Sequence, residues 1–294
     1  MRRKRIILYF SLLFLIPVLV AGGFVAYKQL TSKHKAMMLL IEFEGMDGLN
    51  NMANEMDKRD IPGMVMVDSK FINENCEALK KLQDKNIEIV GVYPQKPLWD
   101  ITYDEQKQIM TDTKSAVERC TGKSMRVFAS KYFAYDEDTI RVAEELSIEY
   151  VMARGTTKAK ATIYKPEEYN VKIFSVSNVQ SRSWGTGSLC DYSYWAREGT
   201  PEDFEKELFA ATEHEKLSPV SHTYIGGLKA RWNNVYLKFF DEADLEWLDL
   251  DEFGKVDIEE PFAQIPQNRE VQYEQPKPSV PLEEEEGVQN VCAE

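Results

Sequence analysis

The feature that most constrains the fold is a regular alternation, from residue 37 onward, of apolar segments of strand length with amphipathic segments of helix length. Strands are expected at 37–43, 63–67, 87–92, 126–129, 149–153, 171–176 and 220–224. Helices are expected at 49–59, 73–85, 103–120, 136–146, 201–215 and 231–240. Strands alternating with helices of ten or more residues form βαβ units and a parallel sheet. Seven or eight such strands over roughly 220 residues predict an α/β fold, specifically an irregular (β/α) barrel.

The amino-terminal residues 1–30 predict a membrane anchor. Arg2–Arg5 are basic, and the twenty-two residues Ile6–Tyr27 are uncharged and mostly apolar. A transmembrane helix needs about 20 such residues, and basic residues ahead of it favour a cytoplasmic amino terminus. Small residues at Ala21–Gly23 leave open a cleaved signal peptide, whose apolar core is shorter. Either alternative predicts that the expected barrel, residues 31–254, lies outside the cytoplasm. The barrel is held at the cell membrane if the anchor is retained and is secreted if the anchor is cleaved.

Residues 255–294 differ from the barrel in composition. They are acidic and rich in proline, with Glu283–Glu286 as the densest acidic run. No apolar face accompanies these charges, so a disordered, solvated tail is expected. The net charge of the whole chain is −13. That charge argues against nucleic acid as a partner, because binding to phosphates needs a basic surface.

The four cysteines do not form a zinc-binding pattern, since no CxxC pair is present. Cys76 falls near the start of one expected helix, and Cys120 falls at the end of the next. Parallel helices of one layer would hold these sulfurs much farther apart than the ~6 Å Cα separation that a disulfide requires. The prediction is therefore that both are buried free thiols.

Four segments, in order and spacing, resemble the polysaccharide deacetylase family (carbohydrate esterase family 4, the chitooligosaccharide deacetylase homology domain). LIEFEG at Leu40–Gly45 is similar to the family's LTFDDG, and SPVSH at Ser218–His222 to its late strand ending in histidine. Asn86–Glu105 is similar to the segment with the family's H-x-x-x-H pair, and Cys120–Val151 to the segment with its RpPyG motif. The resemblance covers roughly residues 37–241 and implies the family's barrel.

The resemblance also implies a divalent metal held by one Asp and two His, but the matching positions in this chain are Gly45, Val92 and Lys96. None of these residues supplies a suitable ligand. The arginine of the RpP motif is matched by Ala129. We therefore expect no metal and no other cofactor. Whether the chain keeps a deacetylase-like hydrolase activity, on carbon–nitrogen bonds other than peptide bonds, stays open.

Two residues keep the chemical character of the family's catalytic positions. Glu44 matches the family's carboxylate base, and His222 matches its general acid. Without a metal, a developing oxyanion would need other donors, and Lys131, Tyr132 and Arg154 lie at or near carboxyl ends of strands. The alternatives are that Glu44 is a surface carboxylate and that His222 is a hydrogen-bonded structural histidine.

Three further residues are candidates for contact with substrate: Asp68 at the end of the second strand, and Asp191 and Trp195 in the aromatic segment CDYSYW. Aromatic side chains stack on the apolar faces of sugars, although half-exposed packing aromatics are the commoner case.

The predicted function is a membrane-anchored, extracytoplasmic polysaccharide deacetylase-like protein that acts on or binds a cell-envelope glycan, without the usual metal-dependent activity. A non-enzymatic envelope scaffold that uses the barrel and the acidic tail is the main alternative. A glycoside hydrolase built on Glu44 and Asp68 is a third, requiring carboxyl groups about 5–9.5 Å apart. The oligomeric state stays open.

Overall fold

The computed structural model describes residues 34–154, 160–181 and 185–255. The predicted anchor and, apart from Lys255, the predicted acidic tail lie outside these ranges. Within the described residues, every helix is too short or too polar to cross a membrane.

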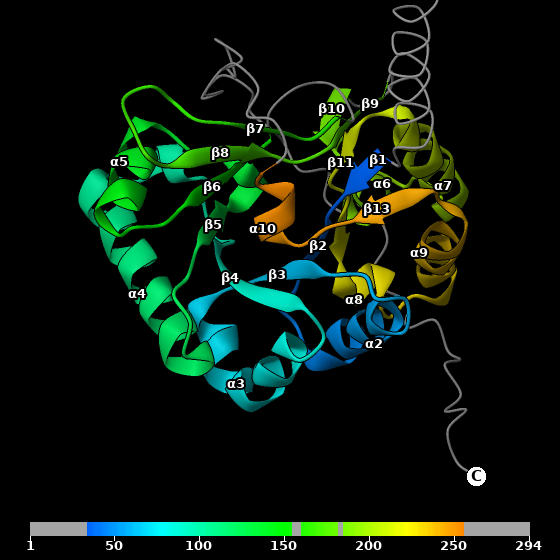
Figure 1. The fold of residues 1–294 in the computed structure, drawn as a ribbon, viewed down its shortest axis with the longest axis horizontal. Coiled ribbons are helices and arrows are strands. Elements are labelled where there is room, and N and C mark those ends of the chain that lie inside the picture. Colours follow the sequence, from blue (N-terminus) through cyan, green and yellow to red (C-terminus); the bar gives the residue numbers. More distant parts are fainter. Residues whose placement is uncertain (1–33, 155–159, 182–184, 256–294) are drawn as a thin grey trace, which may run out of the picture. The chain divides into compact units, whose positions relative to one another are not determined.

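An eight-stranded sheet forms the centre of the domain (Figure 1). Neighbouring strands are parallel except β7, which runs antiparallel to β8. In order across the sheet they are β12 (Val220–His222), β2 (Met38–Ile41), β3 (Gly63–Val67), β4 (Ile87–Tyr93), β5 (Val127–Ser130), β6 (Tyr150–Ala153), β8 (Lys172–Ser175) and β7 (Thr162–Tyr164). The predicted α/β class is confirmed, and the sheet is curled as a deacetylase-type barrel requires.

Strand residues alternate between two apolar layers. On β2, Leu39 and Ile41 pack inside the curled sheet, whereas Met38 and Leu40 pack outward against the helices. Successive side chains of a strand point to opposite faces, so a strand covered on both faces is apolar throughout. This is why the strands read as continuous apolar runs in the sequence.

Helices cover the outside of the sheet (Figure 1). They are α2 (Met46–Asp57), α3 (Ser69–Gln83), α4 (Tyr103–Thr121), α5 (Glu137–Glu145), α6 (Asp191–Trp195), α7 (Pro201–Ala210), α8 (Thr223–Gly226) and α9 (Ala230–Glu242), with short 3₁₀ turns η1 (Leu98–Asp100), η2 (Lys131–Phe133) and η3 (Ala211–Glu213). Local signals set their ends. For α4, Thr102 and Glu105 form a capping box, and Gly122 ends the helix with φ +71°.

The two edge regions of the sheet are joined irregularly rather than by regular strand pairing. Ser177, just after β8, accepts a hydrogen bond from the Leu189 N–H at 2.8 Å. The Leu189 carbonyl in turn accepts from the Val220 N–H of β12 at 3.0 Å. Leu189 follows the hairpin of β9 (Asn178–Ser181) and β10 (Gly185–Ser188). The barrel is therefore irregular, as the sequence predicts.

The amino ends of the strands are covered by a small sheet and a short helix. The sheet has the order β11 (Lys216–Leu217), β1 (His34–Ala36) and β13 (Leu245–Trp247), all parallel. Helix α10 (Leu250–Phe253) follows, and it lies over the middle of the curled sheet in Figure 1. Its Leu250 and Phe253 pack into the interior, where the Phe253 ring stacks on Phe174 with centroids 5.4 Å apart. We call this region the amino end of the barrel.

The prediction of free thiols at Cys76 and Cys120 is wrong, because the two form a disulfide with a Cα–Cα distance of 5.5 Å. Cys76 lies in the middle of α3 rather than near its start, directly after a break in helical geometry at Asn75. Helices α3 and α4 pack closely against each other. The end of α4 therefore meets the middle of α3, a crossing that helix lengths alone do not reveal.

Candidate functional site

A cavity of about 260 Å³ opens at the carboxyl ends of the strands, opposite α10. We call it the carboxyl-end cavity. Its apolar part is formed by residues at or near strand ends, including Ile41, Val92 and Val220. The carboxyl ends of parallel barrel strands are where active sites are built, because the loops that follow each strand converge there.

The turn after β5 contributes two predicted site residues, Lys131 and Tyr132, to the cavity lining. Tyr132 and Phe133 both have positive φ, +62° and +53°. Such left-handed backbone costs a non-glycine residue about 1–3 kcal/mol and occurs mostly where function requires it. The hydroxyl of Ser130 donates to the Ala134 carbonyl and closes the turn. The strained turn directs this segment to the mouth of the barrel.

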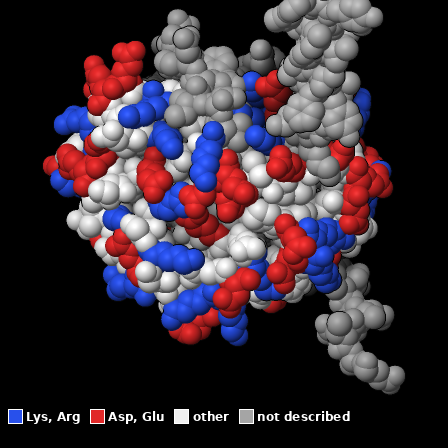
Figure 2. Space-filling view, viewed as in Figure 1, with Lys and Arg blue, Asp and Glu red and all other residues white. Residues whose placement is uncertain are grey.

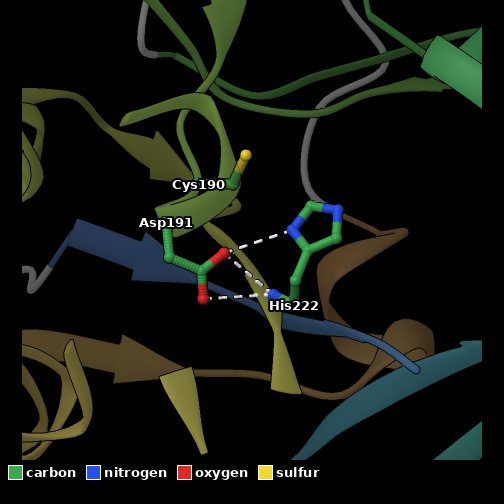
Figure 3. Close-up of side chains that lie close together, drawn as sticks. All are labelled: Cys190, Asp191 and His222. Atoms are coloured by element: carbon green, nitrogen blue, oxygen red, sulfur yellow. Dashed lines mark hydrogen bonds and ion pairs between the residues drawn. The ribbon is translucent and has the colours of Figure 1, made fainter. Parts of the chain in front are cut away.

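His222 ends β12 and is held by Asp191, the first residue of α6 (Figure 3). The Asp191 side chain is fully buried, and its Oδ1 accepts from the His222 Nδ1–H at 3.1 Å and from the His222 backbone N–H at 2.9 Å. The other carboxylate oxygen accepts from the Ser221 hydroxyl at 2.9 Å. Asp191 therefore fixes the imidazole orientation and leaves Nε2 pointing away from the carboxylate (Figure 3).

The environment of His222 keeps its imidazole protonated at neutral pH. Burial lowers the pKa, but hydrogen bonds with the Asp191 carboxylate and the Cys190 side chain outweigh that effect and raise the pKa to about 10. Only 15% of the His222 side chain is exposed. His222 lines the cavity, so it presents a positive, hydrogen-bonding group there.

The residues present do not fit the metal that the family resemblance implies. Val92, at one matched histidine position, is an apolar part of the cavity wall, and Lys96 lies in a different groove beside α4. Within the described residues, Cys190, Asp191 and His222 bring three potential ligand atoms within 4.8 Å of one another (Figure 3). The Asp191 oxygens, however, already accept hydrogen bonds from His222 and Ser221. A divalent ion would have to displace these donors, so we derive no step through a metal.

The segment after β2 contains two carboxylates with different environments. Glu42 is fully buried, and its Oε1 accepts from the backbone N–H groups of Phe43, Glu44 and Gly45 at 2.8, 2.6 and 3.2 Å. Its Oε2 accepts from the Thr223 hydroxyl. Glu44, the predicted base, is exposed and does not line the cavity. Although Glu44 is exposed, its carboxyl group is partly desolvated. This desolvation and the nearby Glu42 charge raise the pKa of Glu44, whereas the Lys229 charge lowers it.

The structure brings together four of the predicted site residues at the cavity, namely Lys131, Tyr132, Arg154 and His222. Asp191 lies directly behind His222. Asp68 lies apart, since its side chain caps α3 by accepting from the Phe71 N–H at 2.7 Å.

Trp195 packs beside the site rather than lining it. Its ring lies 5.9 Å from that of Tyr192, and the Lys229 amino group lies 5.8 Å from the indole centroid.

Sequence reasoning missed Arg197, Cys190 and Tyr224 as cavity-lining residues, whereas Tyr192 belongs to the aromatic segment CDYSYW that the sequence marks as a possible sugar platform. Cys190 and Arg197 lie in or beside the same segment. Tyr224 follows His222 by two residues, and the two rings lie 5.7 Å apart. The sequence signal that could have indicated these residues is the density of aromatic residues around Asp191 and His222.

Comparison with known proteins gives a family match over part of the chain and a shared fold. Residues 31–151 match the family model for polysaccharide deacetylase. No curated protein sequence matches the chain.

Three solved structures illustrate the shared fold. A Mycobacterium smegmatis protein named for polysaccharide deacetylases is 12% identical, with a TM-score of 0.58 over 76% of this chain and 90% of that chain. The Xyl-CE4 domain of a multidomain xylanase from the hindgut metagenome of Trinervitermes trinervoides is 9% identical, with a TM-score of 0.51 over 78% and 95%. A mutant of a Bacillus anthracis CE4 family pseudoenzyme is 12% identical, with a TM-score of 0.50 over 73% and 65%. Residues 31–151 therefore resemble polysaccharide deacetylases, and the described domain shares its fold with these solved structures.

Proposed function

We propose that this chain binds a cell-envelope glycan through the carboxyl-end cavity without deacetylating it by the usual metal-dependent route. The observation that carries this proposal is the composition of the cavity. Val92 lies in the cavity wall at a position where the resemblance implies a metal-binding histidine, and Tyr132, Tyr192 and Tyr224 line the same cavity. Tyrosine rings offer apolar faces for sugar rings and hydroxyls for sugar oxygens. One of the solved structures of this fold is itself named a pseudoenzyme.

The state of His222 supports binding over catalysis. A protonated imidazole donates hydrogen bonds from both nitrogens, and the raised pKa of His222 makes it a weaker general acid than an ordinary imidazolium. Glu44, the other predicted acid–base residue, is exposed outside the cavity lining. Cleavage of an acetyl group needs an activated water and a stabilised oxyanion, and the described cavity residues offer donors for the second requirement only.

The test combines binding with chemistry on the purified full chain. We expect N-acetylated and O-acetylated glycans to bind, measured by calorimetry, with no release of acetate in the presence of Zn²⁺, Co²⁺ or a chelator. Tyr192→Ala should weaken binding by about tenfold, the loss of roughly 1.4 kcal/mol of stacking. Metal-dependent acetate release that is lost in His222→Ala would overturn the non-catalytic part of the proposal. Absence of any glycan binding by a folded chain would overturn the rest.

We also propose that residues 6–27 anchor the chain in the cell membrane and that the barrel lies outside the cytoplasm. The Cys76–Cys120 disulfide supports this, because disulfides persist in oxidising compartments and are rare in the cytosol. Treatment of intact cells with protease should digest the barrel but not a cytoplasmic control protein. Protection of the barrel in intact cells, with digestion only after lysis, would contradict this placement.

A further inference from the structure

The charge of the carboxyl-end cavity is opposite to that of the whole chain. The chain carries a net charge of −13. Among the described residues that line the cavity, the charged side chains are Lys131, Arg154, Arg197 and His222, and none is a carboxylate. By contrast, the face seen in Figure 2, which looks onto α10, carries acidic and basic side chains interspersed. Positive charge is therefore concentrated at the cavity.

The cations reach the cavity from different elements, which argues for a shaped site. Lys131 comes from the strained turn after β5, Arg154 from the end of β6 and Arg197 from just after α6. Both arginines lie close enough to Tyr132 to act on its phenol, because their positive charges lower its pKa against the larger, raising effect of burial. A group of cations that lines one cavity attracts a carboxylate or a phosphate.

Two of the cations are also oriented by side-chain contacts. The Arg197 Nη1–H donates to the Ser193 carbonyl at 2.8 Å, and the Lys131 amino group lies 5.4 Å from the centre of the Tyr132 ring. A guanidinium presents a planar fork of N–H donors that matches the oxygens of a carboxylate or a phosphate.

Among the described residues, two carboxylates near the cavity lie outside its lining. Asp191 is fully buried behind His222, and Glu44 lies outside the lining. A cavity of about 260 Å³ is close to the lower end of ligand pockets, which suits one sugar unit with its substituent.

We propose that the carboxyl-end cavity recognises an acidic sugar, binding its carboxylate or phosphate through Arg154, Arg197 and Lys131 while the ring lies against the tyrosines. This inference rests on the proposed glycan-binding function and names its ligand class. The anion is the shared chemistry of uronic acids and of phosphorylated sugars.

The test compares matched acidic and neutral probes by calorimetry on the full chain. The probes are trigalacturonate and its methyl ester, and glucose 6-phosphate and glucose. We expect at least one acidic member to bind about tenfold or more tightly than its neutral partner, with an affinity that falls as salt is raised. A difference within the galacturonate pair indicates recognition of a carboxylate, and a difference within the glucose pair indicates recognition of a phosphate. Binding of inorganic phosphate with the same affinity as the acidic sugar would remove the sugar from the proposal.

Variants locate the binding. Arg154→Gln and Arg197→Gln should each reduce affinity for the acidic probe by about tenfold and leave affinity for the neutral partner unchanged. Arg141→Gln removes the same charge from exposed α5, where its partner is Asp138, and should bind as the unmodified chain does. Thermal melting verifies that each variant is folded.

The outcomes separate this inference from the proposed function. Equal binding of acidic and neutral probes would overturn acid recognition and leave glycan binding intact. Acid-selective binding that neither arginine variant reduces would place the anion elsewhere and overturn the assignment. If none of these probes binds to the folded chain, acid recognition fails, and the proposed function is decided separately by the acetylated glycans.

Discussion

The amino end and the carboxyl end of the barrel differ in packing and in charge, although the same strands form both. At the amino end, Leu250 and Phe253 of α10 fill the interior, and the charges around them are paired, as in Arg126 with Glu149 at 3.1 Å and Asp251 at 2.6 Å. At the carboxyl end, the interior is left as a cavity, the charged residues among its described lining are cationic, and Tyr132 and Phe133 adopt left-handed backbone. The first arrangement favours stability, and the second is what a binding site requires.

The largest effect on stability is expected from a substitution that leaves a void at the amino end. Phe253→Ala removes a fully buried ring that stacks on Phe174, and we expect the free energy of unfolding to fall by about 3–5 kcal/mol. Urea denaturation measures the loss. Tyr192→Ala at the cavity, where the ring is only partly buried, should cost clearly less stability. Equal losses at the two ends would refute the division of roles.

The Cys76–Cys120 disulfide stabilises the packing of α3 and α4 near the amino end. It joins cysteines 44 residues apart, and its reduction should lower the free energy of unfolding by about 2–4 kcal/mol. Denaturation with and without a thiol reductant measures the difference. The double variant Cys76→Ala/Cys120→Ala provides the control, since reductant should leave its stability unchanged. Identical denaturation of oxidised and reduced wild-type chain would count against the link.

At the carboxyl end, stability should depend on pH through His222, which faces Asp191, Cys190, Tyr192 and Tyr224. The folded state binds the imidazole proton more tightly, with a pKa raised from 6.5 to about 10. The resulting stabilisation is complete below about pH 6.5 and is lost as pH rises through about 10.

Comparing the wild-type chain with His222→Gln isolates this effect from other titrating groups. The stability difference between the two proteins should be largest near pH 6 and shrink steadily toward pH 10. A difference that is constant over that range, or that grows with pH, would contradict a raised pKa at His222.

The smallest expected effect concerns the ion pairs of the amino end. Arg126→Gln should cost about 1 kcal/mol of stability or less, because its three carboxylate neighbours are partly exposed to water. It should not change ligand binding, which calorimetry on the same sample tests. A weakened affinity for any glycan probe would show that the two ends are coupled.

The fold followed from the sequence where local signals decide the outcome. The helix expected at 103–120 spans Tyr103–Thr121, because Thr102 and Gly122 mark its ends within the sequence itself. The strand at 63–67 matches β3 for the same kind of reason, an apolar run between polar turns. The disulfide was mispredicted because it depends on how two helices cross, and on a break at Asn75, neither of which has a local signature.

The candidate site was only partly predictable. His222, Lys131 and Arg154 were found because each lies at or just beyond the carboxyl end of a strand. The contact between Asp191 and His222 was not foreseen, since it joins residues 31 positions apart through the irregular closure at Leu189. Arg197 was missed because it follows α6, a helix of five residues, which is too short for its sequence to show which way a neighbouring side chain points.

The order of strands also has a consequence for how the domain is made. β1 is synthesised first, yet it pairs with β11 and β13, and one edge of β2 pairs only with β12. During synthesis these strand edges stay unpaired until residues 216–247 have been made, whereas β3 is made early enough to pair with the other edge of β2. Unpaired strand edges associate readily with other chains. The edges of β1 and β2 are therefore the ones most exposed to such association until β11, β12 and β13 have been made.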